Sequence, residues 1–124
     1  MQNIKSFDDK PYMTIGIMVV NIIVFVLMSI SGSTLDAQYM AAHGAMYPEY
    51  IKDGQYWRLF TSMFMHFGLM HILNNMVVLG AVGQIVEKAM GHVKLLITFL
   101  VSGMCGSVLS YIVMLYNNDF AVSA

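Results

Sequence analysis

Three long stretches without a charged residue constrain this sequence more than any other feature. They cover residues 11–35, 59–86 and 95–118, and each is 24 to 28 residues long. A helix that crosses the hydrocarbon core of a bilayer needs about 20 largely apolar residues. The stretches therefore predict an all-α membrane protein with three transmembrane helices. The helices are expected at about 12–31, 59–82 and 94–116.

The composition excludes several other classes of protein. Six Lys or Arg and seven Asp or Glu occur among 124 residues, 58% of the residues are apolar, and the mean hydropathy is +0.67. A soluble domain carries roughly 25% charged residues, so this chain has too few to cover a soluble surface. The net charge of −1 and the absence of a basic run argue against a nucleic-acid partner. The first stretch is too long for the apolar core of a cleaved signal peptide.

The connection between the first two predicted helices, residues 32–58, is rich in Tyr and Trp for a loop. Such side chains favour the headgroup level of a bilayer, so we expect this connection to lie in the interface. Basic residues favour the cytoplasmic side. Four of them share the side of the N-terminus and two share the side of the connection: Lys5, Lys10, Lys88 and Lys94 against Lys52 and Arg58. This bias predicts a cytoplasmic N-terminus and an external connection.

The second stretch carries polar side chains that are costly in lipid: His66, His71, Asn74 and Asn75. Such residues normally face a protein interior or a wet cavity. His71 and Asn75 are four residues apart and share a face of a helix. On one continuous helix His66 would lie about 140° from His71 and point elsewhere. Asn74 also lies on another face, so we expect His71 and Asn75 to be aimed at one common point.

The pair of His71 and Asn75 has three interpretations from spacing alone. Fixed N–H donors in a site of low dielectric can stabilise a developing oxyanion. The pair can also be a structural hydrogen bond between helices, worth roughly 0.6 kcal/mol on average in membranes, and spacing by itself favours this interpretation. His66, His71 and nearby Met residues would suit a soft metal such as copper. They do not share one face, and no zinc signature is present, so we expect no metal.

A longer motif surrounds this pair. It reads Gly54-Gln55-Tyr56-Trp57-Arg58-Leu59-Phe60-Thr61, then His66-x4-His71-x3-Asn75-Met76, and continues with Gly83, Glu87, Gly91 and Ser102-Gly103. With these residues the sequence resembles the rhomboid family of intramembrane serine proteases from about Tyr12 to its end.

The resemblance implies a six-helix core with an interfacial first loop and a Ser-His dyad that cleaves transmembrane protein substrates without a cofactor. It implies that His71 and Asn75 help to bind the oxyanion and that His66 orders the site and its waters. Trp57 and Arg58 match the element that holds the first loop. We expect an integral membrane protein, with a bacterial inner membrane as its location.

Glu87 matches an acidic position of the family, and it has two interpretations. It lies 29 residues after Arg58, about 43 Å along a single helix, so the two cannot pair. Glu87 either fixes the inner turn around Gly91 or is a solvated charge that marks the end of the span. In the third stretch, small residues at a spacing of four indicate close packing between helices. These residues are Ser102, Gly103, Gly106, Ser107 and Ser110.

The family nucleophile lies in a Gly-x-Ser-Gly motif and its base in a later His, and residues 1–124 contain neither match. Ser123 lacks the flanking glycines, and His43 and His92 do not fit the base. A nucleophile without a base is weak, so we expect residues 1–124 alone to be inactive. We therefore predict a partial rhomboid-like domain over 1–124, which supplies oxyanion-binding residues to an intramembrane serine endopeptidase.

Two alternatives remain from the sequence. One is a catalytically dead rhomboid-like protein that binds transmembrane clients, and the other is a three-helix membrane protein whose polar residues are structural. The expected partners are the lipid bilayer, transmembrane protein substrates, and either the missing C-terminal helices or another copy of the chain.

Overall fold

The computed structural model describes residues 10–118 and 122–123, and three long helices dominate this part of the chain. They are α1 (Tyr12–Ser31), α5 (Gly68–Met90) and α6 (His92–Tyr116). Each is long and apolar enough to cross a membrane. The described residues contain no named strand, so the predicted class, an all-α membrane protein, is confirmed. Lys5, one of the residues used to predict orientation, lies outside the described residues.

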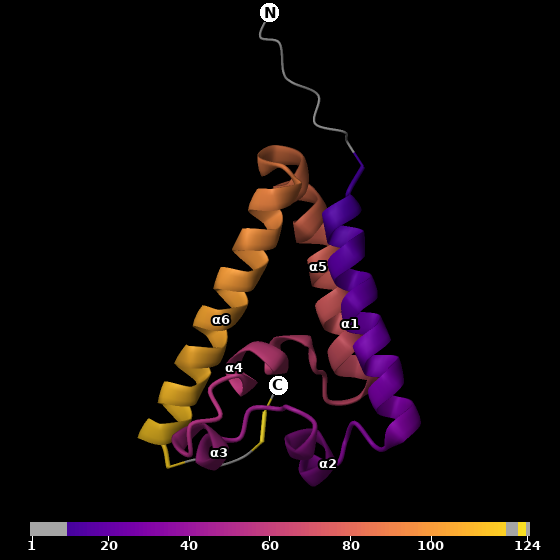
Figure 1. The fold of residues 1–124 in the computed structure, drawn as a ribbon. Coiled ribbons are helices and arrows are strands. Elements are labelled where there is room, and N and C mark those ends of the chain that lie inside the picture. The colour runs from indigo at the N-terminus through magenta and orange to yellow at the C-terminus, as the bar shows by residue number, and fades with distance from the viewer. Residues whose placement is uncertain (1–9, 119–121, 124) are drawn as a thin grey trace, which may run out of the picture.

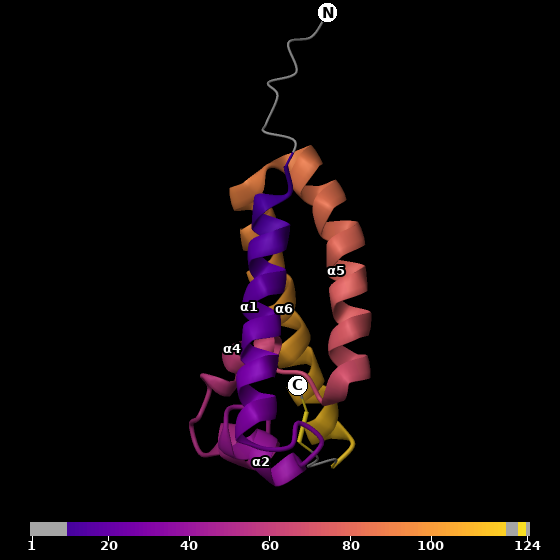
Figure 2. The ribbon, with the colours of Figure 1, turned by 90° about the vertical axis from the view of Figure 1, so that its right-hand side faces the viewer.

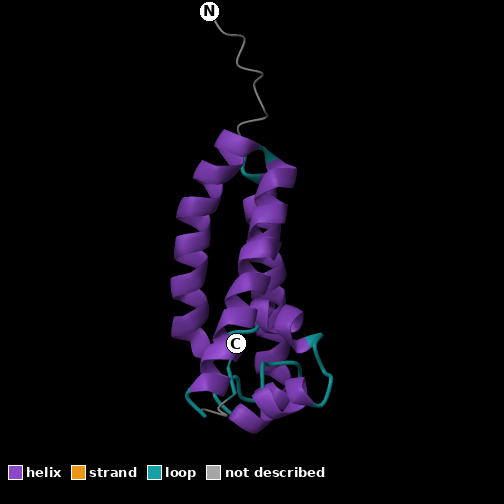
Figure 3. Cartoon of the chain, turned by 90° about the vertical axis from the view of Figure 1, so that its left-hand side faces the viewer, coloured by secondary structure: helices purple, strands orange, loops and turns teal. Residues whose placement is uncertain are grey.

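The long helices diverge from one end of the molecule. Figure 1 shows α1 beside α5, while α6 leaves the turn after α5 at an angle, so that the helices separate toward the opposite end. The short helices α2 (Ala37–Ala42), α3 (Pro48–Lys52) and α4 (Arg58–Thr61) lie at that opposite end. Figures 2 and 3 show the same arrangement from two opposite sides. The connection between α1 and α5 therefore packs across the separated ends of the long helices.

The second long helix begins later than the sequence predicted. Residues 59–67 form the end of α4, a 3₁₀ turn η1 (Ser62–Phe64) and a short extended segment, and α5 starts only at Gly68. Met65 has extended backbone angles, and Gly68 has a φ of +77°. That φ favours glycine, because a Cβ atom would be strained there. The predicted start at 59 was therefore wrong, and the connection after α1 extends to residue 67.

The other predicted boundaries agree more closely. The first span covers 12–31 as predicted, and the third starts at His92 instead of 94 and ends at Tyr116. The second continues past the predicted end at 82 to Met90, where Gly91 closes it with a φ of +94°.

Arg58 lies at the centre of the connection. Its side chain is buried, with 4% exposure. One guanidinium nitrogen, Nη1, donates to the carbonyls of Ala41 and Ala45, and Nε donates to Oε1 of Gln55 at 2.8 Å. The guanidinium carbon also lies 4.8 Å from the ring centroid of Trp57. Arg58 thus bonds the end of α2 and the residues that follow it to the segment that leads into α4.

The connection is also fixed to the residues after α6. Met46 and Ser123 exchange two backbone hydrogen bonds, of 2.7 and 2.8 Å, in an isolated antiparallel bridge. Beside this bridge, Met46 packs with Ile51 and with Met114 of α6. Burial of these apolar side chains holds the connection against the end of α6.

Candidate active site

His71 stands in the first turn of α5, and its ring orientation is fixed by the backbone. The N–H of Phe67, the residue before the helix, donates to Nδ1 of His71 at 3.1 Å. In a neutral imidazole one ring nitrogen accepts and the other carries the proton. Because Nδ1 accepts here, Nε2 carries the proton. His71 therefore offers an N–H donor at a defined position.

His66 lies against His71, contrary to the expectation from a continuous helix. The two ring centroids are 5.0 Å apart, with an interplanar angle of 68°. The expected separation of 140° around a helix axis was wrong, because the extended segment and the turn at Gly68 precede α5. The break between η1 and α5 thus brings the two histidines together.

His66 is neutral at pH 7. Its side chain is 5% exposed, and burial, helped by the nearby His71, lowers its pKa to about 4. Its Nδ1 atom is buried and finds no hydrogen-bond partner among the residues that the structure describes. A buried nitrogen of this kind costs free energy unless another group or a water reaches it.

A cavity of about 620 Å³ lies between the separated helices, and both histidines line it. Asn75, one turn after His71, lines the same cavity. Asn74 and Asn75 are both exposed, but Asn74 is not among the lining residues. The structure thus brings His66, His71 and Asn75 to one space, as expected for His71 and Asn75 from their spacing.

The facing wall of the cavity is built by the small residues of α6. Ser102, Gly103, Gly106, Ser107 and Ser110 all line it. Their roles differ, since an added Cβ at Gly103 would meet the side chain of Met63, whereas nothing lies within 4 Å of one at Gly106. The predicted small-residue packing therefore applies to Gly103, which lets η1 approach α6. Gly106 faces open space.

Asn21 is a polar cavity residue that sequence reasoning missed. It lies in the middle of α1 with 1% exposure and lines the cavity. Its Nδ2 donates to the carbonyl of Ile17 at 2.8 Å. An uncharged amide inside the first apolar stretch was visible in the sequence. The general rule that polar residues in a span mark functional sites could have identified it.

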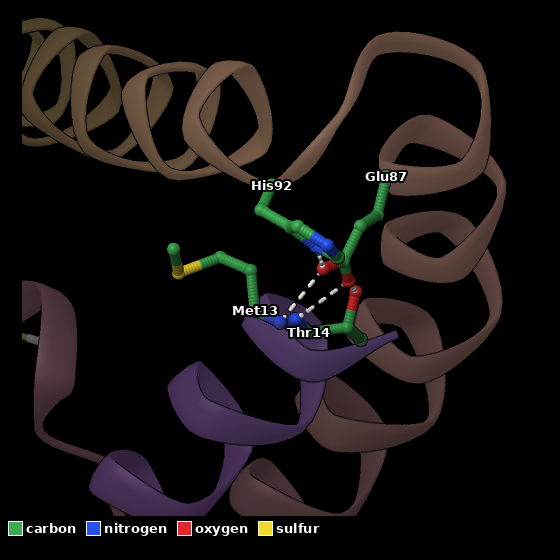
Figure 4. Close-up of polar contacts among 4 residues, drawn as sticks. All are labelled: Met13, Thr14, Glu87 and His92. Atoms are coloured by element: carbon green, nitrogen blue, oxygen red, sulfur yellow. Dashed lines mark hydrogen bonds and ion pairs between the residues drawn. The ribbon is translucent and has the colours of Figure 1, made fainter. Parts of the chain in front are cut away.

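Glu87 caps the N-terminus of α1 from the far end of α5. Its side chain is 3% exposed, so the interpretation as a solvated charge was wrong. Oε2 accepts from the N–H of Met13 at 2.7 Å, and Oε1 accepts from the N–H and the hydroxyl of Thr14 at 2.9 and 2.7 Å. Nδ1 of His92, at the start of α6, pairs with Oε2. Figure 4 shows that these groups converge on the carboxylate.

The first N–H groups of a helix lack acceptors within the helix. The carboxylate of Glu87 supplies acceptors for two of them, those of Met13 and Thr14. The same carboxylate reaches His92 across the turn at Gly91. Glu87 thus contacts the residue that follows the inner turn, and its contacts extend to α1.

The remaining histidines lie away from the cavity. His43 is exposed on the connection, and its Nδ1 bonds to the carbonyl of Tyr39 at 2.7 Å. His92 is engaged with Glu87 at the opposite end. Ser123 lines the cavity, and its hydroxyl lies 3.9 Å from the sulfur of Met114. Among the described residues, no third histidine and no cluster of potential metal ligands joins His66 and His71.

Comparison with known proteins identifies the family of the chain. The family model of the Rhomboid domain matches residues 53–123. Rhomboid protease GluP of Bacillus subtilis (strain 168) is 32% identical over 105 residues, which are 85% of this chain and 21% of that protein. Rhomboid protease GlpG of Pectobacterium atrosepticum is 39% identical over 74% of this chain and 32% of its own length. No solved structure matches the chain.

A plant relative shows the same pattern. RHOMBOID-like protein 7 of Arabidopsis thaliana is 38% identical over 68% of this chain and 26% of its own length. The chain thus spans between about a fifth and a third of the length of these three relatives. Because the family match covers more than half of the chain and takes in η1, α5 and α6 around the cavity, the chain belongs to the rhomboid family.

Proposed function

We propose that this chain forms the oxyanion-binding part of a rhomboid-type intramembrane serine endopeptidase that cleaves transmembrane protein substrates. His71 and Asn75 are the proposed donors. The observation that carries the proposal is the bond from the Phe67 N–H to Nδ1 of His71, which leaves Nε2–H as a donor beside the cavity. The similarity to the rhomboid proteases GluP and GlpG supports the reaction class.

The proposed reaction begins when a serine hydroxyl attacks the scissile carbonyl carbon and a histidine base takes its proton. Negative charge then develops on the carbonyl oxygen. Donors that are already fixed in a water-poor site stabilise that charge without reorganisation. His71 donates through Nε2–H and Asn75 through its amide. The serine and the base come from outside residues 1–124, because the Gly-x-Ser-Gly motif does not occur in this sequence.

His66 is proposed as a positioning residue. It stays neutral at pH 7 because burial lowers its pKa to about 4, so it does not add a positive charge beside His71. Its unpartnered Nδ1 is suited to hold a water next to the donors. We further propose that the N-terminus is cytoplasmic, that the connection after α1 lies on the external side, and that the membrane is a bacterial inner membrane.

The proposal is tested with the protease completed by the helices that carry the serine and the base. We expect His71→Ala and Asn75→Ala each to lower kcat by about 10²–10³, the usual effect of losing one oxyanion donor. KM for a transmembrane substrate in liposomes should change little. Asn74→Ala is the matched control, since Asn74 neighbours Asn75 and is exposed as Asn75 is, but lies outside the cavity. Unchanged kcat in both site variants would contradict the assignment.

A dead rhomboid-like protein that binds transmembrane clients is the competing function. It would use the same cavity between the helices without cleaving what it binds. Under both proposals, a serine-directed fluorophosphonate should not label residues 1–124 alone. An in-frame Gly-x-Ser-Gly motif in the coding sequence after Ala124, followed by spans with a His, would favour the protease. A stop codon with no partner gene would favour the dead protein.

A further inference from the structure

A second cavity lies between α1 and the segment formed by α4 and η1. Its volume is about 430 Å³, within the ~300–1,000 Å³ typical of ligand sites. We call it the α1 groove, and its lining residues are Val20, Val24, Met28, His43, Phe60, Thr61, Phe64 and Met65. Met65 is 5% exposed and also lines the cavity of the two histidines. It therefore forms part of the wall between the two spaces.

Most of the lining of the α1 groove is apolar, and Thr61 and His43 each already have a hydrogen bond to a backbone carbonyl. The Thr61 hydroxyl donates to the carbonyl of Gly44 at 2.7 Å. Nδ1 of His43 bonds to the carbonyl of Tyr39 at 2.7 Å. No polar ligand is needed to satisfy these two groups, so the groove suits an apolar occupant.

The α1 groove is continuous with the surface that α1 presents to lipid. Val20 is 48% exposed and Phe60 is 46% exposed, so the groove is open at its side. Val24 and Met28 belong to the half of α1 that leads into the connection, and Val20 lies just before the middle of the helix. Around a membrane-spanning helix the surrounding medium at this depth is hydrocarbon. Lipid chains therefore have direct access to the groove.

We propose that the α1 groove binds one acyl chain of a phospholipid from the leaflet on the side of the connection. Exposed His43, at the end of α2, then lies toward the headgroup. From the headgroup end the chain first passes Met65, which packs beside Met28 and whose flexible thioether adapts to irregular apolar contacts. It then continues along Val24, Val20 and Phe60. Since His66 follows Met65 directly, lipid in the groove supports the wall of the histidine cavity from outside.

Photolabelling of the whole chain tests the proposal. The protein is reconstituted in phosphatidylcholine vesicles that contain a phosphatidylcholine with a diazirine in one acyl chain, and adducts are mapped by peptide mass spectrometry. We expect adducts to concentrate on groove residues such as Phe60 and Phe64. Val20→Trp fills the groove and should remove most of these adducts. Val19→Trp is the matched control, because Val19 is 45% exposed on the same helix but does not line the groove.

Photolabelling of the unmodified protein tests the proposal even if a variant fails to fold. Adducts spread evenly over the exposed residues of α1, α5 and α6 would overturn the proposal. So would adducts on Phe60 and Phe64 that persist in a folded Val20→Trp variant, with folding checked by circular dichroism. Cross-links from the groove to a second copy of the chain would identify a protein occupant, and they would also overturn it.

Discussion

Two histidines in contact illustrate how single residues acquire their chemistry here. His71 accepts a hydrogen bond from a backbone N–H, which fixes the proton on Nε2. His66 lies beside it, and its Nδ1 has no hydrogen-bond partner within residues 10–118 and 122–123. The sequence alone does not distinguish the two imidazole rings. Their different hydrogen bonding comes from the break in the backbone between η1 and α5. The protonation of His66 is the property at this scale that an experiment can follow.

We expect the pH dependence of stability to follow the protonation of His66. The pKa of His66 in the folded chain is about 4, below the ordinary value of about 6.5 that the unfolded chain retains. Between these values the unfolded state binds more protons, so stability is full above about pH 6.5 and falls as the pH drops toward 4. Thermal unfolding in detergent micelles should therefore show a Tm that falls over this range.

The control separates His66 from other acid-sensitive groups. His66→Gln should flatten the fall in Tm between pH 6.5 and 4, because the variant has no imidazole at this site to protonate. His43→Gln removes an exposed imidazole and should leave the fall in place. A slope that is the same in His66→Gln and in the unmodified chain would show that His66 does not titrate in this way.

At the scale of elements, the sequence predicted α1 and α6 more closely than α5, and the reason is physical. A long stretch without charge predicts a span well when it begins and ends at polar residues, as it does for Tyr12–Ser31. The apolar residues after 59 read as membrane helix, yet they form α4 and η1 before Gly68 turns the chain. At the other end, the span was predicted to end at 82, before the charged Glu87, but α1 supplies donors that allow Glu87 to be buried within α5. Contacts between elements determine where α5 begins and ends. A local sequence pattern does not reveal such contacts.

The close packing of η1 against α6 leads to a prediction at the same scale. An added Cβ at Gly103 would lie 2.2 Å from Cε and 3.0 Å from Sδ of Met63. These atoms belong to the flexible end of Met63, so an alanine at Gly103 makes that side chain move and lose its contact with α6. Inside a helix, alanine is more favourable than glycine by about 0.5–1 kcal/mol. Gly106→Ala, one turn along the same wall, has no atom within 4 Å and should raise the stability by about this amount. Gly103→Ala should raise it less, because Met63 must move. Equal unfolding midpoints for the two variants in a chemical denaturation series would contradict this packing.

At the scale of the whole molecule, one buried carboxylate joins all three long helices. Glu87 belongs to α5, its partners Met13 and Thr14 open α1, and His92 opens α6. The connection and the histidine cavity lie at the separated ends of the helices. The opposite end, which contains Glu87, is held together by polar contacts (Figures 1 and 4). The polar contacts that join the three long helices therefore lie at the opposite end from the proposed chemistry.

Replacement of Glu87 tests how the molecule is held together. In Glu87→Gln the amide nitrogen cannot accept, so at least one N–H at the start of α1 loses its partner. A buried donor left without a partner costs about 1–3 kcal/mol. We expect a loss of stability of that size, together with faster hydrogen exchange at the amides of Met13 and Thr14. His92→Ala should cost less, because three donors from Met13 and Thr14 remain on the carboxylate. Glu49→Gln, at an exposed carboxylate, should change neither measurement. Unchanged exchange at Met13 and Thr14 in Glu87→Gln would mean that α1 keeps its first turn without this cap.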